Sequence, residues 1–133
     1  YSVRSCHATN SLPGKTSVFD QMRCIVGERY KLIYNLLPGL PWVPVDFSGT
    51  EMFAELKRMH KSGELDALSS RLYFSPTRPM FELYDLRNDP CEQHNLIDDP
   101  VLKEIRNDLI LKLTYKMIED EDFVTLPHPK IYE

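Results

Sequence analysis

Residues 81–100 read FELYDLRNDPCEQHNLIDDP, and this stretch joins a short apolar strand to a long helix. The aromatic and branched residues of FELYD favour a β-strand, and the triplet NDP that ends at Pro90 favours a turn. Asp99 followed by Pro100 is typical of a helix start, with the aspartate as N-cap and the proline at the first helical position. The stretch therefore predicts a strand at residues 80–85, then a turn, then a helix.

The helix that starts there is expected to cover residues 100–118. Its apolar residues recur every three or four positions, and they are Leu102, Ile105, Leu109, Leu113 and Met117. Such a stripe must pack against an apolar surface, most simply a sheet. The acidic residues at positions 119–122 lie where the helix dipole disfavours negative charge, so the helix should end there. Residues 123–133, which include Pro127 and Pro129, predict an extended tail.

Further strands are expected at residues 1–8, 21–26 and 29–35. The last two are separated by the dipeptide Gly27-Glu28, which predicts a two-residue hairpin loop with glycine at positive φ. The sheet should therefore be antiparallel, because hairpins join neighbouring strands.

Arg23 is expected on a largely apolar face of this hairpin. The predicted register places it opposite Leu32 and places Ile25 opposite Tyr30. A guanidinium on such a face should pair with a carboxylate or point into a cleft. The alternative is a side chain that lays its stem along apolar surface and keeps its head in water. His7, at the end of the first strand, has the simple interpretation of a surface polar group.

A shorter helix is expected at residues 50–62, with Ser48 and Glu51 spaced as a capping box and Gly63 as the C-terminal stop. A weaker apolar periodicity follows it, and residues 71–74 predict a strand. Taken together, the elements predict an α+β fold: an antiparallel sheet of about four strands packed by a long C-terminal helix, with a second, shorter helix.

The length and charge of the chain narrow the class of protein. With 133 residues it is one domain with a modest core. The formal net charge of -4 disfavours nucleic acid or an anionic membrane as main partner, because a phosphate-binding surface needs clustered Lys and Arg. No apolar run approaches the roughly 20 residues that span a bilayer. The first residue is Tyr1 rather than methionine, so we expect a fragment of a larger protein.

The cysteines are Cys6, Cys24 and Cys91, an odd number at wide spacing. The sequence therefore predicts neither a disulfide framework nor a zinc site. One disulfide with one remaining thiol stays open as an alternative. Cys24 has apolar neighbours in sequence and is expected to be buried and unreactive.

Three segments together resemble the sulfatase family. The series ELYDL, NDP and NL within residues 82–96 resembles the segment that precedes the last helix of sulfatases. Residues 22–35, MRCIVGERYKLIYN, are similar to a PMR-type strand followed by a turn and an RYKLI strand, although Gln21 stands in place of the expected proline. Residues 35–46 resemble the sulfamidase branch, the N-sulfoglucosamine sulfohydrolases, in which an NL start leads to a PFPID-like run.

The resemblance implies that residues 1–133 are a single C-terminal subdomain of a sulfatase whose catalytic domain lies upstream. Such enzymes use a formylglycine made from a cysteine in a CxPSR-type motif, with a calcium ion bound by carboxylates to hold the sulfate. None of the cysteines here begins such a motif. We therefore expect no catalytic residue, metal or cofactor in this fragment, with calcium and formylglycine in the missing catalytic domain, and we expect the fragment to be inactive alone.

The resemblance also implies two candidates for the rim of the substrate cleft. His7 lies where sulfamidase-like proteins carry a histidine shortly before the PMR-type strand, and Arg23 matches the arginine of that strand. For Arg23 a structural role at the domain interface is the alternative. The expected partners are the upstream catalytic domain of the same chain and a sulfated sugar, without nucleic acid or membrane. The expected location is exported, periplasmic or extracellular, or lysosomal. A flank left uncovered by the missing domain should expose an apolar patch.

A function of a different class stays open at this point. A stand-alone carbohydrate-binding or interaction module could use Trp42, Tyr34 and Tyr73 as stacking faces for sugar rings. Trp42 among prolines is more simply a plug that holds a loop to its core. A third alternative is a nonenzymatic relative whose upstream domain has lost the cysteine.

Overall fold

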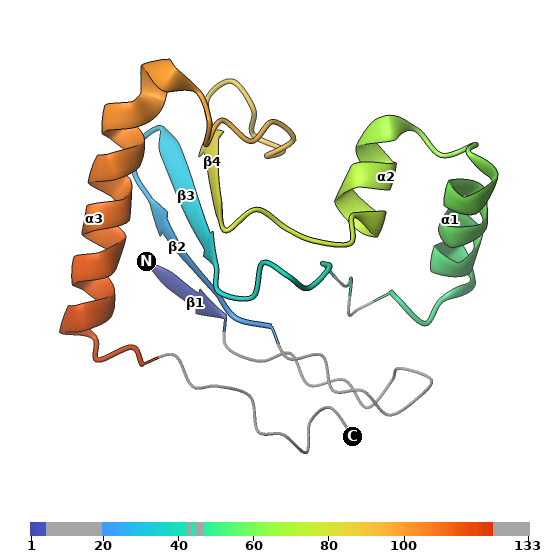
Figure 1. Ribbon diagram of the computed structural model, residues 1–133, viewed down its shortest axis with the longest axis horizontal. Helices are drawn as coiled ribbons and strands as arrows, with labels where there is room; N and C mark the ends of the chain where they lie inside the picture. Colours follow the sequence, from blue (N-terminus) through green and yellow to red (C-terminus); the bar gives the residue numbers. More distant parts are fainter. Residues whose placement is uncertain (5–19, 43, 45–46, 124–133) are drawn as a thin grey trace. The chain divides into compact units, whose positions relative to one another are not determined.

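A computed structural model gives the fold, and the residues that it describes are 1–4, 20–42, 44 and 47–123. The chain divides into two compact units. The described residues of unit 1 lie in Tyr1–Arg4, Gln21–Leu36 and 79–123, and they contain the sheet and the long helix (Figure 1). Unit 2 comprises Asp20 and the described residues of Leu37–Arg78, with two short helices. That the whole chain is one C-terminal subdomain of a larger protein stays a prediction.

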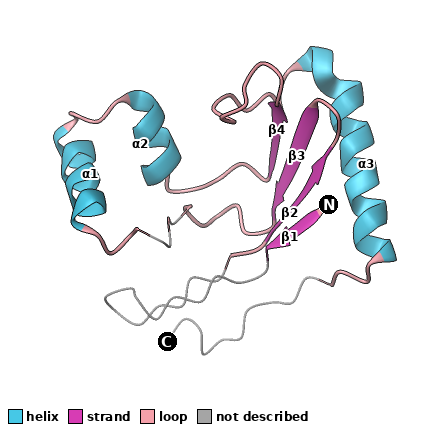
Figure 2. Cartoon of the chain, turned by 180° about the vertical axis from the view of Figure 1, so that it is seen from behind, coloured by secondary structure: helices cyan, strands magenta, loops and turns pink. Residues whose placement is uncertain are grey.

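Unit 1 is built on a four-stranded sheet in the order β1-β2-β3-β4 (Figure 2). The strands are β1 (Ser2–Arg4), β2 (Met22–Val26), β3 (Tyr30–Asn35) and β4 (Phe81–Asp85). Each strand pairs antiparallel with its neighbour in sequence, and the FELYD segment forms β4. The predicted α+β fold with an antiparallel sheet is confirmed.

The long helix α3 (Lys103–Glu119) packs against this sheet. It follows the 3-10 turn η1 (Pro100–Leu102), whose N-cap Asp99 accepts a hydrogen bond from the Val101 N–H at 2.9 Å. The buried core combines two leucines of the central strands with two of the helix, and they are Leu32, Leu83, Leu109 and Leu113. Burying a leucine side chain stabilises a fold by about 1.5–3 kcal/mol, so the predicted apolar stripe holds the helix on the sheet.

The turn between β2 and β3 differs from the predicted one. The Gly27 N–H donates to the Tyr30 carbonyl at 2.8 Å, so the two turn residues are Glu28 and Arg29. The prediction gave Gly27 a positive φ in the loop. The observed φ of Gly27 lies outside the left-handed region, so this part of the prediction was wrong. From the turn, Arg29 reaches Asp85 at the end of β4, with 2.6 Å between Nη2 and Oδ2. This tertiary ion pair accompanies a turn that local sequence did not predict.

The predicted strand register was wrong by two residues. Ile25 lies opposite Leu32 rather than Tyr30, and Arg23 lies opposite Tyr34 rather than Leu32. Side chains alternate between the faces of a strand, so a shift of two residues leaves every side chain on its predicted face. Arg23 therefore shares its face with Ile25, which packs against the core under α3.

The first helix of unit 2 is α1 (Glu51–Ser62), which agrees with the helix predicted at residues 50–62. Its N-cap is Thr50, whose Oγ1 accepts a hydrogen bond from the Phe53 N–H at 3.3 Å, and the predicted cap at Ser48 was wrong. Gly63 ends the helix with a φ of 75°, the left-handed conformation that favours glycine, as predicted.

The predicted strand at residues 71–74 is wrong, because these residues form the second half of α2 (Ala67–Phe74). Asp66 caps this helix by accepting a hydrogen bond from the Ser69 N–H at 2.9 Å. Tyr73 and Phe74 pack their rings against other aromatic rings of unit 2. The side-chain packing and the cap outweigh the intrinsic strand preference of aromatic residues.

The cysteines and the ends of the chain complete the comparison with the predicted elements. Cys24 is half-buried rather than buried, Cys91 is exposed, and both thiols are free. Cys6, residues 5–8 of the first predicted strand and the predicted tail beyond Phe123 lie outside the described residues. Of the helices that the structure describes, none has the length and apolar character needed to cross a bilayer.

Candidate functional site

The two candidate rim residues differ in what the structure says of them. His7 lies outside the described residues, so its role stays a prediction. Arg23 is described, and only 1% of its side chain is exposed. The surroundings of Arg23 therefore decide what this part of the predicted site can do.

Arg23 forms a two-point ion pair with Asp122, which lies just beyond the end of α3. Its Nη2 donates to Oδ1 at 2.7 Å, and its Nε donates to the other carboxylate oxygen. A third donor of the guanidinium, Nη1, lies 3.1 Å from the Met22 carbonyl oxygen. The Tyr1 hydroxyl donates to the same carboxylate. The pair thus ties β2 to the end of α3 and to the first described residue.

The pair also fixes the charges of its members. The hydrogen bond from Arg23 holds the pKa of the Asp122 carboxyl below its usual range, although burial acts in the opposite direction. The same hydrogen bond raises the pKa of Arg23. Burial, and then the neighbouring Asp122 carboxylate, raise the pKa of Tyr1 to about 12. Groups whose pKa values move away from neutrality make poor proton carriers at pH 7, so this cluster suits a structural tie.

Of the alternatives for Arg23, the structure shows the carboxylate partner. A guanidinium whose charge is met inside the chain fits the structural role, while the rim role stays a prediction. Asp122 was not predicted as the partner of Arg23, because the acidic run at residues 119–122 was interpreted only as the end of the helix. The usable signal was that an arginine on an apolar strand face needs an acid, and this run ends the helix that covers that face.

The residues that carry the sulfatase resemblance also act as structural ties. Asp85 receives the Arg29 guanidinium, the Arg87 N–H at 3.2 Å and the Asn88 side-chain amide at 2.8 Å. The hydrogen bond from Arg29, followed by those from Arg87 and Asn88, holds the pKa of the Asp85 carboxyl far below its usual range. Asp85 therefore stays ionised and fixes the turn that follows β4.

The loop after that turn is held in the same way. Glu92 pairs with Lys31 of β3, with 2.7 Å between Nζ and Oε2. The Asn95 Oδ1 accepts hydrogen bonds from the Leu83 N–H at 2.9 Å and from the Ile97 N–H at 3.0 Å. Asn95 thereby satisfies a backbone donor on β4, which is an edge strand of the sheet.

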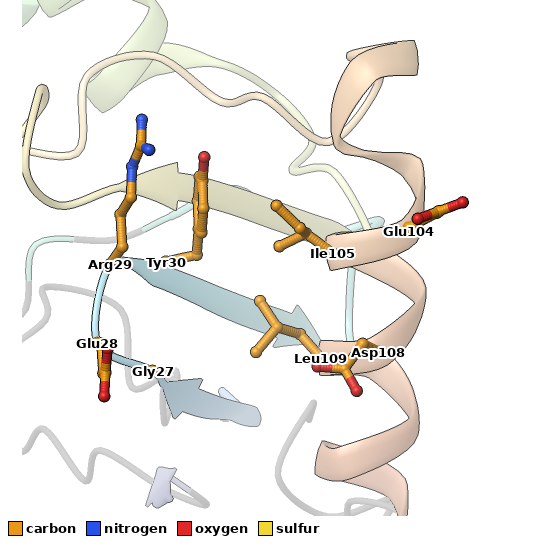
Figure 3. Close-up of a pocket in the computed structure, with 8 residues that line it drawn as sticks. All are labelled: Gly27, Glu28, Arg29, Tyr30, Glu104, Ile105, Asp108 and Leu109. Carbon is orange, nitrogen blue, oxygen red and sulfur yellow. The ribbon is translucent and has the colours of Figure 1, made fainter.

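A pocket of about 440 Å³ lies between the β2–β3 turn and the first half of α3 (Figure 3). Its lining combines an apolar part with carboxylates, and these residues are Tyr30, Ile105, Leu109, Glu28, Glu104 and Asp108. The Arg29 guanidinium also lines the pocket. It pairs with Asp85 and lies 5.0 Å from the centre of the Tyr30 ring. A sulfate group would meet more negative than positive charge here, so the pocket does not suit a sulfated ligand.

A metal centre is also lacking in the described part of the chain. Within these residues no group of three or more His, Cys, Asp or Glu side chains could hold a metal ion. The buried carboxylate of Asp85 and the half-buried carboxylate of Asp122 each pair with an arginine instead. The residues that the structure describes therefore do not fit a calcium site.

The aromatic faces considered for sugar stacking are engaged by other rings. Trp42 lies against Tyr73, with 5.8 Å between ring centres. Tyr34 stacks on Phe81 at 4.8 Å with an angle of 19° between the rings. Trp42 therefore fits the role of a plug that holds its loop. Because Trp42, Tyr34 and Tyr73 contact other rings, they give less support to a carbohydrate-binding module.

Comparison with known proteins gives the following similarities. No family model matches the chain. Two curated proteins are similar to it, both named ulvan-active sulfatase and both from Formosa agariphila. One is 59% identical over 32 residues, which are 24% of this chain and 6% of that protein. The other is 31% identical over 101 residues, which are 71% of this chain and 17% of that protein. The chain thus spans less than a fifth of the length of either relative.

These similarities agree with the sulfatase resemblance but not with its finer division. The longer one extends over most of the chain, well beyond the ELYDL to NL series. Neither relative is named a sulfamidase. The comparisons therefore support a relationship of this chain to the sulfatases, a family of hydrolases, without singling out the sulfamidase branch.

Proposed function

We propose that this chain is the C-terminal supporting part of a sulfatase that removes sulfate from a sulfated carbohydrate, and that it is inactive alone. The observation that carries the proposal is the 31% identity to a sulfatase over 101 residues. The proposal is also supported by the polar side chains around the sheet, which have structural roles: Asp85 and Asp122 each pair with an arginine.

The chemistry of sulfate removal needs groups beyond these ties. An activated oxygen nucleophile must approach a tetrahedral anion whose charge is offset by cations. The formylglycine nucleophile and the calcium ion would belong to a catalytic domain upstream in the same polypeptide. His7 is then the candidate for contact with substrate at the cleft rim. Arg23, held by Asp122, has the supporting role.

Two similarities each suggest a substrate to test. Residues 35–46 resemble sulfamidases, which favours an N-sulfated glucosamine. The curated relatives are named for ulvan, which favours that carbohydrate instead. We propose N-sulfated glucosamine as the first substrate to test, because the proline-rich segment resembles that of sulfamidases. We also propose an exported or lysosomal location.

The test is a sulfate-release assay of the complete gene product that contains this chain, on N-sulfated glucosamine and on ulvan. We expect release from one of the two substrates, loss of release on calcium chelation, and no release by the 133-residue chain alone. Absence of release from both substrates by the folded complete product would refute the proposal. Binding of sugar by the isolated chain without release would favour the binding module.

The rim role of His7 is tested in the same assay by a matched pair of variants. His7→Ala should raise KM, since it removes a contact with substrate. His94→Ala serves as control, because His94 is 75% exposed and pairs only with Asp89 of its own loop in the described part of the chain. Equal kinetic constants for the two variants would remove His7 from the proposed rim.

A further inference from the structure

The pocket between the β2–β3 turn and α3 has an apolar floor. The floor is formed by Tyr30, Ile105 and Leu109, which are all part of the hydrophobic core of unit 1. Leu109 is buried, whereas Tyr30 and Ile105 are half-buried and so offer apolar surface to a ligand. The volume of about 440 Å³ lies within the range of small-molecule pockets.

The Tyr30 ring in this floor already attracts one cation. The Arg29 guanidinium lies 5.0 Å from the ring centre, and its charge is met by Asp85. In Figure 3 the Tyr30 side chain stands between Arg29 on one side and Ile105 on the other. The opposite face of the ring is therefore turned to the apolar floor, where a second cation within about 6 Å would meet the same negative π face.

The rim of the pocket carries negative charge. The carboxylates of Glu28, Glu104 and Asp108 stand around the edge of the floor (Figure 3), and all three side chains are exposed. Asp108 pairs with Lys112 at 2.7 Å. Within the part of the chain that the structure describes, neither Glu28 nor Glu104 forms an ion pair. The pocket thus combines an apolar floor with a negative rim, and its complement is a cation with an apolar body.

We propose that this pocket binds a small organic cation, an ammonium ion carried on an apolar body such as a benzyl group. The body lies on the floor, and the ammonium reaches the mouth, where Glu28 and Glu104 attract it. A bare metal ion does not fit, because the floor is apolar and the described residues hold no group of three or more metal-binding side chains. This binding site goes beyond the proposed sulfatase function and does not depend on it.

The test is a binding titration of the complete gene product that contains this chain, with its isoleucine methyl groups labelled for NMR. Ile105 lines the floor, so its methyl signal reports on this pocket, and Ile105→Val identifies that signal by its loss. The probes are benzylamine, which is an ammonium ion at pH 7, its neutral counterpart benzyl alcohol, and the anion benzoate. We expect benzylamine to shift the Ile105 signal with a Kd on the order of 1 mM, since ligands of so few atoms bind weakly.

The charges of the probe and of the rim set the further expectations. Benzyl alcohol should bind at least about fivefold more weakly than benzylamine, and benzoate more weakly still. Glu104→Gln should weaken benzylamine about threefold and leave benzyl alcohol unchanged. Glu51→Gln is the matched control, because Glu51 is also an exposed acid in the first turn of a helix but belongs to unit 2. Salt at about 0.5 M should weaken benzylamine alone, since it screens exposed charges.

An Ile105 signal that does not move with benzylamine would overturn the proposal. Equal affinity for benzylamine and benzyl alcohol would overturn it too, because the pocket would then be an apolar hollow without preference for a cation. The same holds if Glu104→Gln and Glu51→Gln bind benzylamine equally well and salt has no effect. The titration does not require sulfate release, so a failed pocket leaves the proposed reaction standing, and an inactive product can still confirm the pocket.

Discussion

Replacing Asp122 with asparagine removes the negative charge that faces the buried guanidinium of Arg23. The two side chains are 12% and 1% exposed, so the guanidinium has no direct route to water in the folded state. Breaking a buried ion pair by removing one partner costs about 3–5 kcal/mol, because the other charge stays buried without compensation. Asp122 keeps some exposure and asparagine can still accept one hydrogen bond, so we expect a loss of about 3 kcal/mol in the free energy of unfolding.

The assay is urea unfolding of the chain at pH 7, followed by far-UV circular dichroism. Asp108→Asn is the matched control, because its pair with Lys112 is 55% and 61% exposed and exposed pairs contribute about 0–1 kcal/mol. The double variant Arg23→Met with Asp122→Leu should recover most of the lost stability, since an apolar pair can replace a buried ion pair. A loss for Asp122→Asn no larger than that of Asp108→Asn would refute the reasoning.

The same pair predicts how stability depends on pH. The pKa of Asp122 is lowered in the folded state, so its contribution is fully present above the pKa of the unfolded chain, about 3.9 for an aspartate. The contribution is lost as pH falls through the lower folded-state value. The wild-type chain should therefore lose stability below about pH 4, and Asp122→Asn should show a smaller loss over that range. Equal pH dependence of the two proteins would contradict this assignment.

Three further changes test the fold. Leu113→Ala, at a side chain 2% exposed in the core, should lower the free energy of unfolding by about 2–5 kcal/mol in the same urea assay, and a loss under about 1 kcal/mol would contradict the core assignment. Gly63→Ala should cost about 1 kcal/mol, seen as a lower melting temperature, because its φ of 75° disfavours a side chain, whereas Gly39→Ala, where a Cβ meets no atom within 4 Å, should change little. Asn95→Ala should speed hydrogen exchange of the Leu83 amide, which donates to Asn95, and unchanged exchange would show that this bond does not protect β4.

Much of the fold of unit 1 could be predicted because its signals are local. Asp99 and Pro100 predict a helix start, because aspartate favours the N-cap and proline has a fixed φ that suits the first helical position. The structure places η1 and α3 there. The apolar spacing of α3 also predicts which face lies on the sheet, since the helical period alone sets it.

Other features could not be predicted because they depend on residues far apart in sequence. The hairpin register depends on a turn from which Arg29 reaches Asp85, 56 positions away. The helix α2 depends on an Asp66 cap and on ring packing that outweigh the strand preference of Tyr73 and Phe74. Local preferences are weak, so contacts of this kind decide wherever the two disagree.

The sequence by itself determined the fold class, the start of α3 and the resemblance to sulfatases, because each is written in short runs of adjacent or regularly spaced residues. Only the tertiary structure decided the environment of Arg23. It brings Asp122, which is 99 positions away, to the guanidinium, and no local pattern encodes a pairing across that distance. The physical reason is that a charge on an apolar face must find its partner in space, and the fold decides which acid is near.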